Sequence, residues 1–348
     1  MKKPLALLLT DTHFDKDNVE VVLDILQQAL DKCLELGIDR IFHLGDVFTS
    51  RLGQGLMVLL AFKKWIKKCD DAGVKIYLIA GNHDKTDQDS EQSYLNVYQG
   101  SFGNLTLFEK ETSLFIDGVF CAFLPYFLES GSYPSRLNSL SLKAKKISDS
   151  KKILFTHVAV DGVMNNDGSF VRNELSFKRF RDFDSVFVGH YHNRSQVNKN
   201  VFYIGSPRPK DFGEDNNKGF TILYRDGSHE LISARFKKYF RLNVDVSKGR
   251  EVIEKLKLKY NNSDDNIRFV ISGEEEALAA ISSKEFSDLG IELKKQPLRL
   301  SKSMKAAENS EFLEFDKKMI MQSFLQYCSD NKITRSDRSL GMNYIKNI

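Results

Sequence analysis

The chain has 348 residues, of which 41% are hydrophobic and 28% are charged, and its formal net charge is +4. This length suffices for a substantial hydrophobic core and predicts two domains, or one large domain with additions. The small net charge permits a nucleic-acid partner without requiring one, so any basic surface must be local.

The four cysteines are scattered and form no CxxC pair. Neither a thiolate metal site nor a disulfide framework is therefore expected, and we expect a cytoplasmic protein, in the host cytoplasm if a phage encodes it. The apolar run at residues 5–9 is followed at once by Asp11 and His13. This run is too short for a signal peptide or a membrane span, so we expect no membrane association.

The N-terminal part of the chain predicts alternating strands and helices. Segments 5–10, 40–44 and 74–80 are mostly apolar, and the last is a continuous apolar run apart from one lysine, which indicates buried strands. They recur at helical spacing in two intervening segments, 18–36 and 57–69. This order is typical of a parallel sheet with crossover helices.

From about residue 105 the pattern changes to shorter strands. Asp117-Gly118 and Asp226-Gly227 each separate two apolar arms, which predicts hairpins. Further strands are expected at 151–156, 185–188 and 201–204. Together the segments predict an α/β fold in which two sheets pack face to face, are flanked by helices, and gather their polar loops at one edge.

After residue 236 the pattern indicates a small α/β unit. Strands are expected at 241–246, 267–272 and 291–295, and helices at 250–259 and 274–286. The unit contains no histidine and no carboxylates gathered at strand ends, so we do not expect catalysis there. We therefore predict three parts, namely residues 1–236, residues 237–300, and a linker with a C-terminal helix in 301–348.

Polar side chains follow five of the predicted strands: Asp11 with His13, Asp46, Asn82 with His83, His157, and His190 with His192. Carboxylate, amide and imidazole ligands without sulfur suit Mn or Fe(II) better than structural zinc. A carboxylate between two such ions can bridge them, and ions roughly 3.5–4 Å apart clamp a phosphate ester. Any one histidine could instead be an ordinary core or surface residue. The occurrence of five histidines at four of these strand ends, with Asp46 at the fifth, favours the metal site.

The stretch Gly81-Asn82-His83-Asp84 is the densest of these strand ends. Asp84 offers a carboxylate that could hold His83 in one tautomer. The alternative is an ordinary strand-to-helix turn in which Asn82 and Asp84 act as capping residues.

These motifs, in their order and spacing, resemble the calcineurin-like metallophosphoesterases. The resemblance covers about residues 5–192 and rests on Asp11-x-His13, Gly45-Asp46, Gly81-Asn82-His83-Asp84, His157 and Gly189-His190-x-His192. Within that superfamily the chain resembles the SbcD-type nucleases of DNA double-strand break repair. In size and layout it resembles the recombination nuclease subunits of large tailed phages. That closer resemblance rests on Gly45-Asp46-Val47-Phe48, Tyr203-Ile204-Gly205-Ser206-Pro207, Asp211-Phe212-Gly213-Glu214 and Lys218-Gly219.

The resemblance implies a role for each of these residues. One ion would be held by Asp11, His13, Asp46 and His192, and the other by Asp46, Asn82, His157 and His190, so that Asp46 bridges. His83 would protonate the leaving oxygen or stabilise charge in the transition state, and Asp84 would orient it. The unit after residue 236 resembles the capping domain of the family, which binds DNA.

Three further basic residues are candidates for DNA contact: Arg51, Arg208 and Lys210. Each could equally be a solvated surface residue. We expect His43 to be a packed histidine and His229 to be solvated. No ladder of alternating aromatic and basic residues, as single-strand-binding proteins use, is apparent.

We therefore expect a Mn-dependent DNA exonuclease or endonuclease subunit with two divalent ions. The resemblance implies a homodimer that binds DNA and an SbcC-like coiled-coil ATPase. The helix predicted over residues 311–329 is amphipathic and is our candidate for docking that ATPase, although its apolar face could pack on its own domain instead. The alternative functions are another calcineurin-like phosphatase or phosphodiesterase, and a non-catalytic scaffold for DNA ends.

Overall fold

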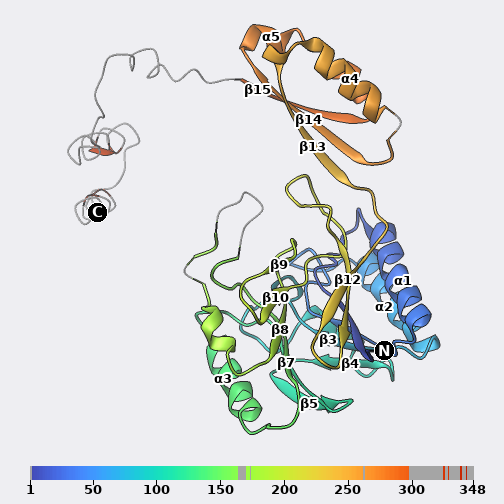
Figure 1. Cartoon of the computed structure of the whole chain (residues 1–348), viewed down its shortest axis with the longest axis vertical. Helices are drawn as coiled ribbons and strands as arrows, with labels where there is room; N and C mark the ends of the chain where they lie inside the picture. The colour runs from blue at the N-terminus through green and yellow to red at the C-terminus, as the bar shows by residue number, and fades with distance from the viewer. Residues whose placement is uncertain are drawn as a thin grey trace.

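The computed structural model describes residues 2–163, 170–172, 174–261 and 263–297, together with residues 324, 325, 328, 338 and 342. The helix predicted over 311–329 lies almost entirely outside these residues. Two six-stranded sheets form the main body, and a three-stranded sheet follows them (Figure 1). Among the described residues, no helix is both long and apolar enough to cross a membrane.

The first sheet has the strand order β12-β11-β1-β2-β3-β4. Its strands β1 to β4 are parallel, whereas β11 and β12 add an antiparallel hairpin at one edge. Their bounds are Pro4–Leu9 for β1, Arg40–His43 for β2, Lys75–Ile79 for β3, Leu105–Phe108 for β4, Gly219–Tyr224 for β11 and His229–Ser233 for β12.

The second sheet has the strand order β5-β6-β7-β8-β10-β9. Its central strands β6, β7, β8 and β10 are parallel, and β5 and β9 are antiparallel edge strands. Their bounds are Thr112–Ile116 for β5, Val119–Leu124 for β6, Lys152–His157 for β7, Ser185–Gly189 for β8, Ser195–Gln196 for β9 and Val201–Tyr203 for β10.

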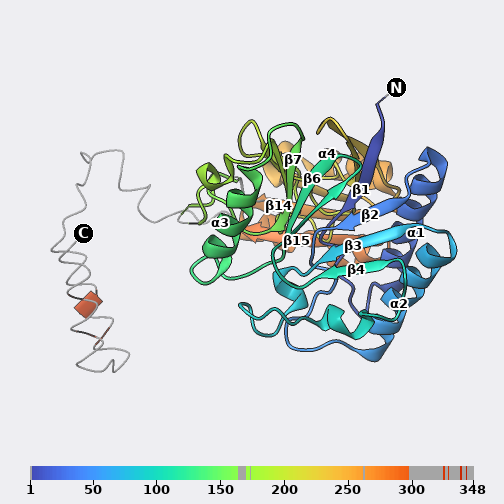
Figure 2. The same cartoon turned by 90° about the horizontal axis from the view of Figure 1, so that it is seen from below.

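Helices cover the outer face of each sheet. Helices α1 (Val19–Leu36) and α2 (Leu56–Asp71) bury their apolar stripes against the first sheet, and α3 (Tyr133–Ala144) does the same on the second (Figure 2). Between the sheets lies a separate aromatic layer, in which Phe42 contacts the rings of Phe123 and Phe155 edge-on at centroid distances of 5.2 and 4.9 Å. The predicted fold class is confirmed for this body.

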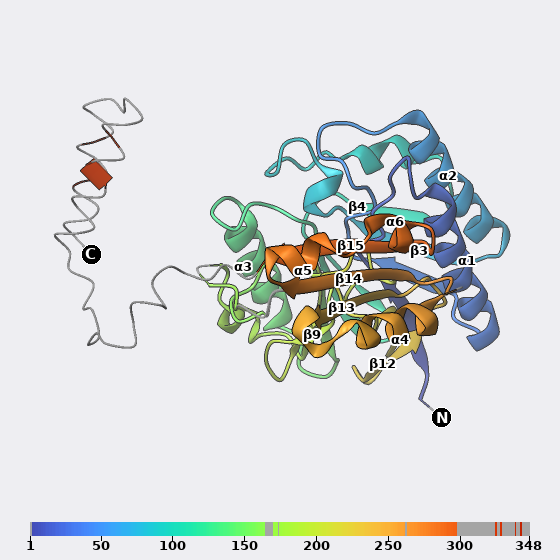
Figure 3. The same ribbon diagram turned by 90° about the horizontal axis from the view of Figure 1, so that it is seen from above.

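The third sheet has its own core. Strands β13 (Tyr239–Asp245), β14 (Asn266–Gly273) and β15 (Ile291–Pro297) are parallel and bury apolar side chains against α4 (Arg250–Tyr260). The third sheet follows β12 in the chain. It lies at the end of the main body where the parallel strands of the first sheet have their carboxyl ends (Figure 3).

The structure differs from the sequence prediction in several elements. The helix expected over residues 274–286 is wrong, because the segment forms two short helices, α5 (Glu275–Ala279) and α6 (Ser283–Ser287). Ser282 between them has an extended backbone with ψ at 118°, which ends the helical path. Helix α3 and strands β4 and β9 were not predicted.

Candidate metal centre

The five predicted strand ends meet at one edge of the two sheets. β1, β2 and β3 of the first sheet deliver Asp11, Asp46 and Asn82, and β7 and β8 of the second deliver His157 and His190. Asp11, His13, Asp46 and His190 all have a positive φ, between 50° and 100°. Such backbone strain in non-glycine residues gathers at functional sites, where the surrounding fold must enforce it.

The first cluster contains Asp11, His13 and His192. The Nε2 atoms of the two histidines lie 3.0 Å apart, and Asp11 Oδ1 lies 3.8 Å from His13 Nε2 and 4.0 Å from His192 Nε2. Asp11 Oδ1 is buried and has no hydrogen-bond partner among the described residues. A buried carboxylate oxygen is costly to leave without a partner. A cation between these three atoms would satisfy it.

The second cluster contains Asp46, His157 and His190. Asp46 Oδ1 lies 3.4 Å from His157 Nε2. Asn82, predicted as a ligand, lies in the same group, since its Oδ1 is 3.1 Å from His157 Nε2 and 3.0 Å from His190 Nδ1. Asp46 also reaches the first cluster, because its second oxygen, Oδ2, lies 3.7 Å from His13 Nε2. One carboxylate oxygen thus faces each cluster, as the predicted bridge requires.

Contacts behind the clusters orient three of the imidazoles. His157 Nδ1 lies 2.8 Å from the Leu44 carbonyl oxygen, and His13 Nδ1 lies 3.2 Å from the Phe48 carbonyl oxygen. Since a carbonyl oxygen only accepts, each Nδ1 carries the proton and donates it. Each Nε2 is thereby the ring atom that faces the centre and can offer a lone pair to a metal, the arrangement typical of metal-ligating histidines.

His192 is oriented by a carboxylate that sequence analysis quoted in a motif without giving it a role. Glu214 Oε1 lies 2.7 Å from His192 Nδ1, and Glu214 Oε2 lies 2.9 Å from Lys218 Nζ and 3.3 Å from Ser206 Oγ. Burial opposes the charge on Glu214, but His192 and Lys218 outweigh it and lower the pKa of Glu214 to about 2. This residue therefore stays ionised and fixes the His192 ring. Only a motif known from relatives could have pointed to it.

The pKa values of the buried histidines fit a ligand role. Burial lowers the pKa of His13 well below its usual value, and burial together with His157 lowers the pKa of His190 to about 3. Both rings are therefore neutral at neutral pH, the form that binds metal. Burial also acts to lower the pKa of His157, but the Asp46 carboxylate outweighs it and raises that pKa to about 9. A divalent cation would replace this proton as the counter-charge of Asp46.

His83 lies beside the first cluster without being part of it. Its ring meets the His13 ring edge-on with centroids 5.0 Å apart. Its Nδ1 lies 2.5 Å from the Thr49 carbonyl oxygen, and its Nε2 lies 3.3 Å from Arg51 Nη2. The prediction that Asp84 orients His83 is wrong, because both Asp84 oxygens accept from backbone amides, those of Val47, Phe48 and Gly81. The Thr49 carbonyl holds the His83 tautomer instead.

Asp84 has a structural role in this geometry. It is fully buried, and burial, together with the nearby Asp46, raises the pKa of Asp84 to about 7. Its hydrogen bonds join the turn after β2 to the turn after β3, and so hold Asp46 next to Asn82. The capping alternative for Asp84 is the one that the structure supports.

The remaining candidates lie in different places. Lys210 is half-buried, and burial lowers its pKa although the charges of Glu214, Asp11 and Asp46 oppose this shift. Arg208 instead lines a hollow between α1 and the start of β13, and its Nη1 donates to the Pro209 carbonyl.

His43 is buried as expected, with Nε2 3.0 Å from Thr12 Oγ1. The expectation that His229 is solvated is wrong.

The His229 ring is half-buried against two aromatic rings of the second sheet. It meets Phe202 and Phe187 edge-on at centroid distances of 4.5 and 5.0 Å. This hairpin residue therefore contributes to packing between the sheets and has no part in the metal centre.

Two layers of sheet whose strand ends share two adjacent carboxylate–histidine clusters define a metallophosphoesterase. The profile of the family described as calcineurin-like phosphoesterase matches residues 5–194, which is more than half of the chain. The chain belongs to this family, as its motifs predicted.

Two proteins whose names refer to an exonuclease and to DNA double-strand break repair are among the relatives that the chain resembles at low identity. It is 23% identical over 212 residues to "Exonuclease subunit 1" of Enterobacteria phage T4, a match that covers 58% of this chain and 58% of that protein. It is 23% identical over 288 residues to "DNA double-strand break repair protein Mre11" of Sulfurisphaera tokodaii, covering 76% of this chain and 72% of that protein. The match thus spans little more than half the length of the phage protein.

Among solved structures, the chain is similar to a dimetal phosphatase from Danio rerio. The TM-score is 0.45 and the identity 13%, with coverage of 64% of this chain and 93% of that chain. A similarity this low adds nothing to the family assignment.

The packing of Gly81 against Asp46 generates a first prediction. A Cβ at Gly81 would lie 2.8 Å from Asp46 Cγ, although the φ of −90° suits any residue. Gly81→Ala should therefore displace the bridging carboxylate and release bound metal, as measured by elemental analysis after gel filtration in Mn-containing buffer. Gly55→Ala is the matched control, because its φ is −68° and nothing lies within 4 Å of the added atom. Equal metal content in the two variants would contradict the prediction.

Proposed function

We propose that the chain is a metal-dependent DNA nuclease subunit that hydrolyses phosphodiester bonds and uses two Mn ions. The observation that carries the proposal is the pair of clusters that Asp46 joins, one oxygen to each. When bound, two ions of this kind activate water as the nucleophile and neutralise charge on the phosphate. The mixture of oxygen and imidazole nitrogen donors supports Mn as the preferred ion.

The ligand sets proposed for the two ions follow the clusters. Asp11, His13, Asp46 and His192 would hold one ion, and Asp46, Asn82, His157 and His190 would hold the other. The distances between their donor atoms and the unpartnered Asp11 Oδ1 support both sets.

His83 is proposed to exchange a proton with the leaving oxygen through Nε2, or to stabilise charge there. The Thr49 carbonyl holds its Nδ1 proton, so Nε2 is the atom that can act. Arg51 donates to that Nε2 in the free protein. On DNA binding, we propose, Arg51 exchanges this contact for a phosphate oxygen, and Lys210 supplies a second cation at the rim.

DNA is favoured over a small phosphodiester by the relatives, whose printed names describe an exonuclease subunit and DNA double-strand break repair proteins. We assign residues 1–236 as the nuclease domain, 237–300 as a DNA-binding cap, and 301–348 as the linker and docking helix for a coiled-coil ATPase. A non-catalytic DNA-end scaffold is disfavoured, because a scaffold would not need the fixed His83 tautomer.

The proposal is tested with purified protein on labelled linear duplex DNA in Mn-containing buffer, with and without the ATPase, beside bis(p-nitrophenyl) phosphate. We expect Mn-dependent shortening or internal cleavage of DNA that EDTA abolishes. Hydrolysis of the small ester without any cleavage of DNA would assign the chain to the phosphodiesterases instead. Absence of both activities in metal-loaded protein would favour the scaffold.

The second prediction separates the proposed role of His83 from metal binding. His83→Ala should retain the metal content of the natural chain, because its ring touches the first cluster without offering a ligand. Its nuclease rate should fall by about 10²–10⁴-fold, the usual contribution of a general acid or base. Metal analysis and single-turnover cleavage are measured on the same preparation. Loss of metal together with activity would place His83 among the ligands.

An exposed apolar patch supports the homodimer part of the proposal. Leu52, Leu56, Met57 and Leu60, at the start of α2, are between 49% and 93% exposed. Large apolar side chains that gather on one surface commonly mark a protein interface. Because Arg51 precedes Leu52 directly, a second copy bound here would place two metal centres near one shared surface.

The third prediction concerns this patch. Met57→Glu should convert a dimer into a monomer, because a charge would be buried without a partner. Light scattering after gel filtration measures the mass. Leu258→Glu, at a position 74% exposed on α4, is the control and should leave the mass unchanged. A natural chain that is monomeric, or a Met57→Glu variant that remains dimeric, would contradict the patch as the interface.

A further inference from the structure

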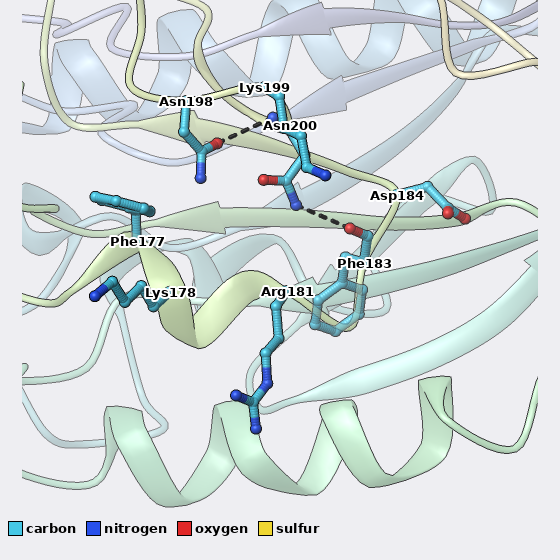
Figure 4. Close-up of a pocket in the computed structure, with 8 residues that line it drawn as sticks. All are labelled: Phe177, Lys178, Arg181, Phe183, Asp184, Asn198, Lys199 and Asn200. Carbon is cyan, nitrogen blue, oxygen red and sulfur yellow. Dashed lines mark hydrogen bonds between the residues drawn. The ribbon is translucent and has the colours of Figure 1, made fainter.

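A second candidate site lies at the opposite end of β8 from the metal centre. A hollow of about 530 Å³ is lined by Phe177, Lys178, Arg181, Phe183, Asp184, Asn198, Lys199 and Asn200 (Figure 4). Asp184 precedes β8 directly and His190 follows it directly, so the five residues of the strand separate the hollow from the second cluster. That corresponds to about 16 Å along the strand.

The rim of this hollow is positively charged. Lys178, Arg181 and Lys199 are exposed, and within the described ranges none of them has a carboxylate in ion-pair distance. Asp182 lies 3.6 Å from Lys145 Nζ, and the Asp184 carboxylate at the edge of the hollow accepts from the Lys152 amide, so the hollow holds three cations against one carboxylate. The three cations therefore remain available for an anionic ligand.

The floor offers groups that recognise a planar polar ring. Asn200 Nδ2 donates to the Phe183 carbonyl at 2.9 Å, and Asn198 Oδ1 accepts from the amides of Asn200 and Val201. Asn198 Nδ2 and Asn200 Oδ1 consequently point into the hollow as one donor and one acceptor, with no partner in the described part of the chain, and Phe177 lies across from them (Figure 4). Cations, an aromatic face and two amide groups are thus gathered in one place.

We propose that this hollow binds an unpaired stretch of the nucleic-acid strand, separately from the metal centre; the proposal rests on the DNA nuclease function given above. Lys178, Arg181 and Lys199 contact phosphates, Phe177 stacks on one base, and the two asparagine amides contact the edge of that base. A duplex fits less well, because its stacked and paired bases cannot present a free face to Phe177.

The site is not visible as a sequence ladder because two segments build it. Residues 177–184 supply the aromatic wall and two cations, and residues 198–200 supply the amides and the third cation. β8 and β10 pair in parallel, which places the starts of these two strands side by side. Fold topology, and not residue spacing, therefore gathers the ligand-binding groups.

The test measures binding of a fluorescent 20-nucleotide oligo-dT by anisotropy in EDTA, so that no cleavage occurs. The triple variant Lys178→Ala, Arg181→Ala, Lys199→Ala should bind at least about 10-fold more weakly than the natural chain at moderate salt. Its plot of log affinity against log salt should be shallower by about 2, the value for three lost phosphate contacts on single strands. The control variant Lys3→Ala, Lys63→Ala, Lys64→Ala removes the same charge from exposed lysines elsewhere.

A second variant tests the stacking contact. Phe177→Ala should weaken oligo-dT binding by at least about 5-fold and leave the salt slope unchanged. The proposal is overturned if the natural chain does not bind oligo-dT, or if the triple variant binds as tightly as its control. The single-strand assignment is also overturned by a second pair of results. In that case Phe177→Ala binds oligo-dT as tightly as the natural chain, and the triple variant loses as much affinity for a duplex as for the single strand.

These results are independent of the proposed nuclease activity. Hydrolysis of bis(p-nitrophenyl) phosphate by the triple variant should match that of the natural chain, because no substituted residue lies in either cluster. The natural chain could bind oligo-dT without cleaving DNA, while the triple variant loses that binding. This result would overturn the nuclease function and leave the binding site standing.

Discussion

The metal centre depends on how closely three backbone segments approach one another. A Cβ at Gly45 would lie 2.7 Å from Gly81 Cα, and a Cβ at Gly189 would lie 2.7 Å from the Leu44 carbonyl oxygen. Glycine is needed at Gly45 for a second reason, since its φ is +92°. Because these contacts join both sheets, the carboxylates of the first can lie within 4 Å of the histidines of the second. Any bulk here would separate the two halves of the site.

Burial gives this arrangement its chemical character. The second nitrogens of His13, His157 and His192 contact fixed acceptors behind the clusters, so each ring turns its Nε2 toward the centre. In a dry interior an unpaired carboxylate oxygen, such as Asp11 Oδ1, is costly. An ion-pair network that served stability alone would leave no such orphan and would not strain four backbone positions. The donor set and the orphaned oxygen together fit cations better than structural ion pairs.

Sequence reasoning located the strand ends because buried parallel strands are continuous apolar runs, and the polar residue after each run is conspicuous. It failed where side-chain direction decides the outcome. Asp84 follows His83 in the chain, yet the tight turn at 82–84 sends its carboxylate back toward the Gly81 amide and away from the imidazole. Helix α3 was missed because its segment contains Pro134 and several serines, although Tyr133, Leu137, Leu140 and Ala144 do form one buried stripe. The basic hollow was missed because it needs the pairing of β8 with β10.

The residues that orient His192 also connect the metal centre to the third sheet. Glu214 and Lys218 hold the His192 ring and carbonyl from the loop that follows β10. The same loop contacts the third sheet, since the Phe212 ring lies edge-on to Tyr239 with centroids 5.0 Å apart and Arg268 stacks over Phe212. Asn216 exchanges two hydrogen bonds with the Tyr239 backbone. The loop that orients His192 through Glu214 is therefore the same loop that packs on the third sheet through Phe212 and Asn216.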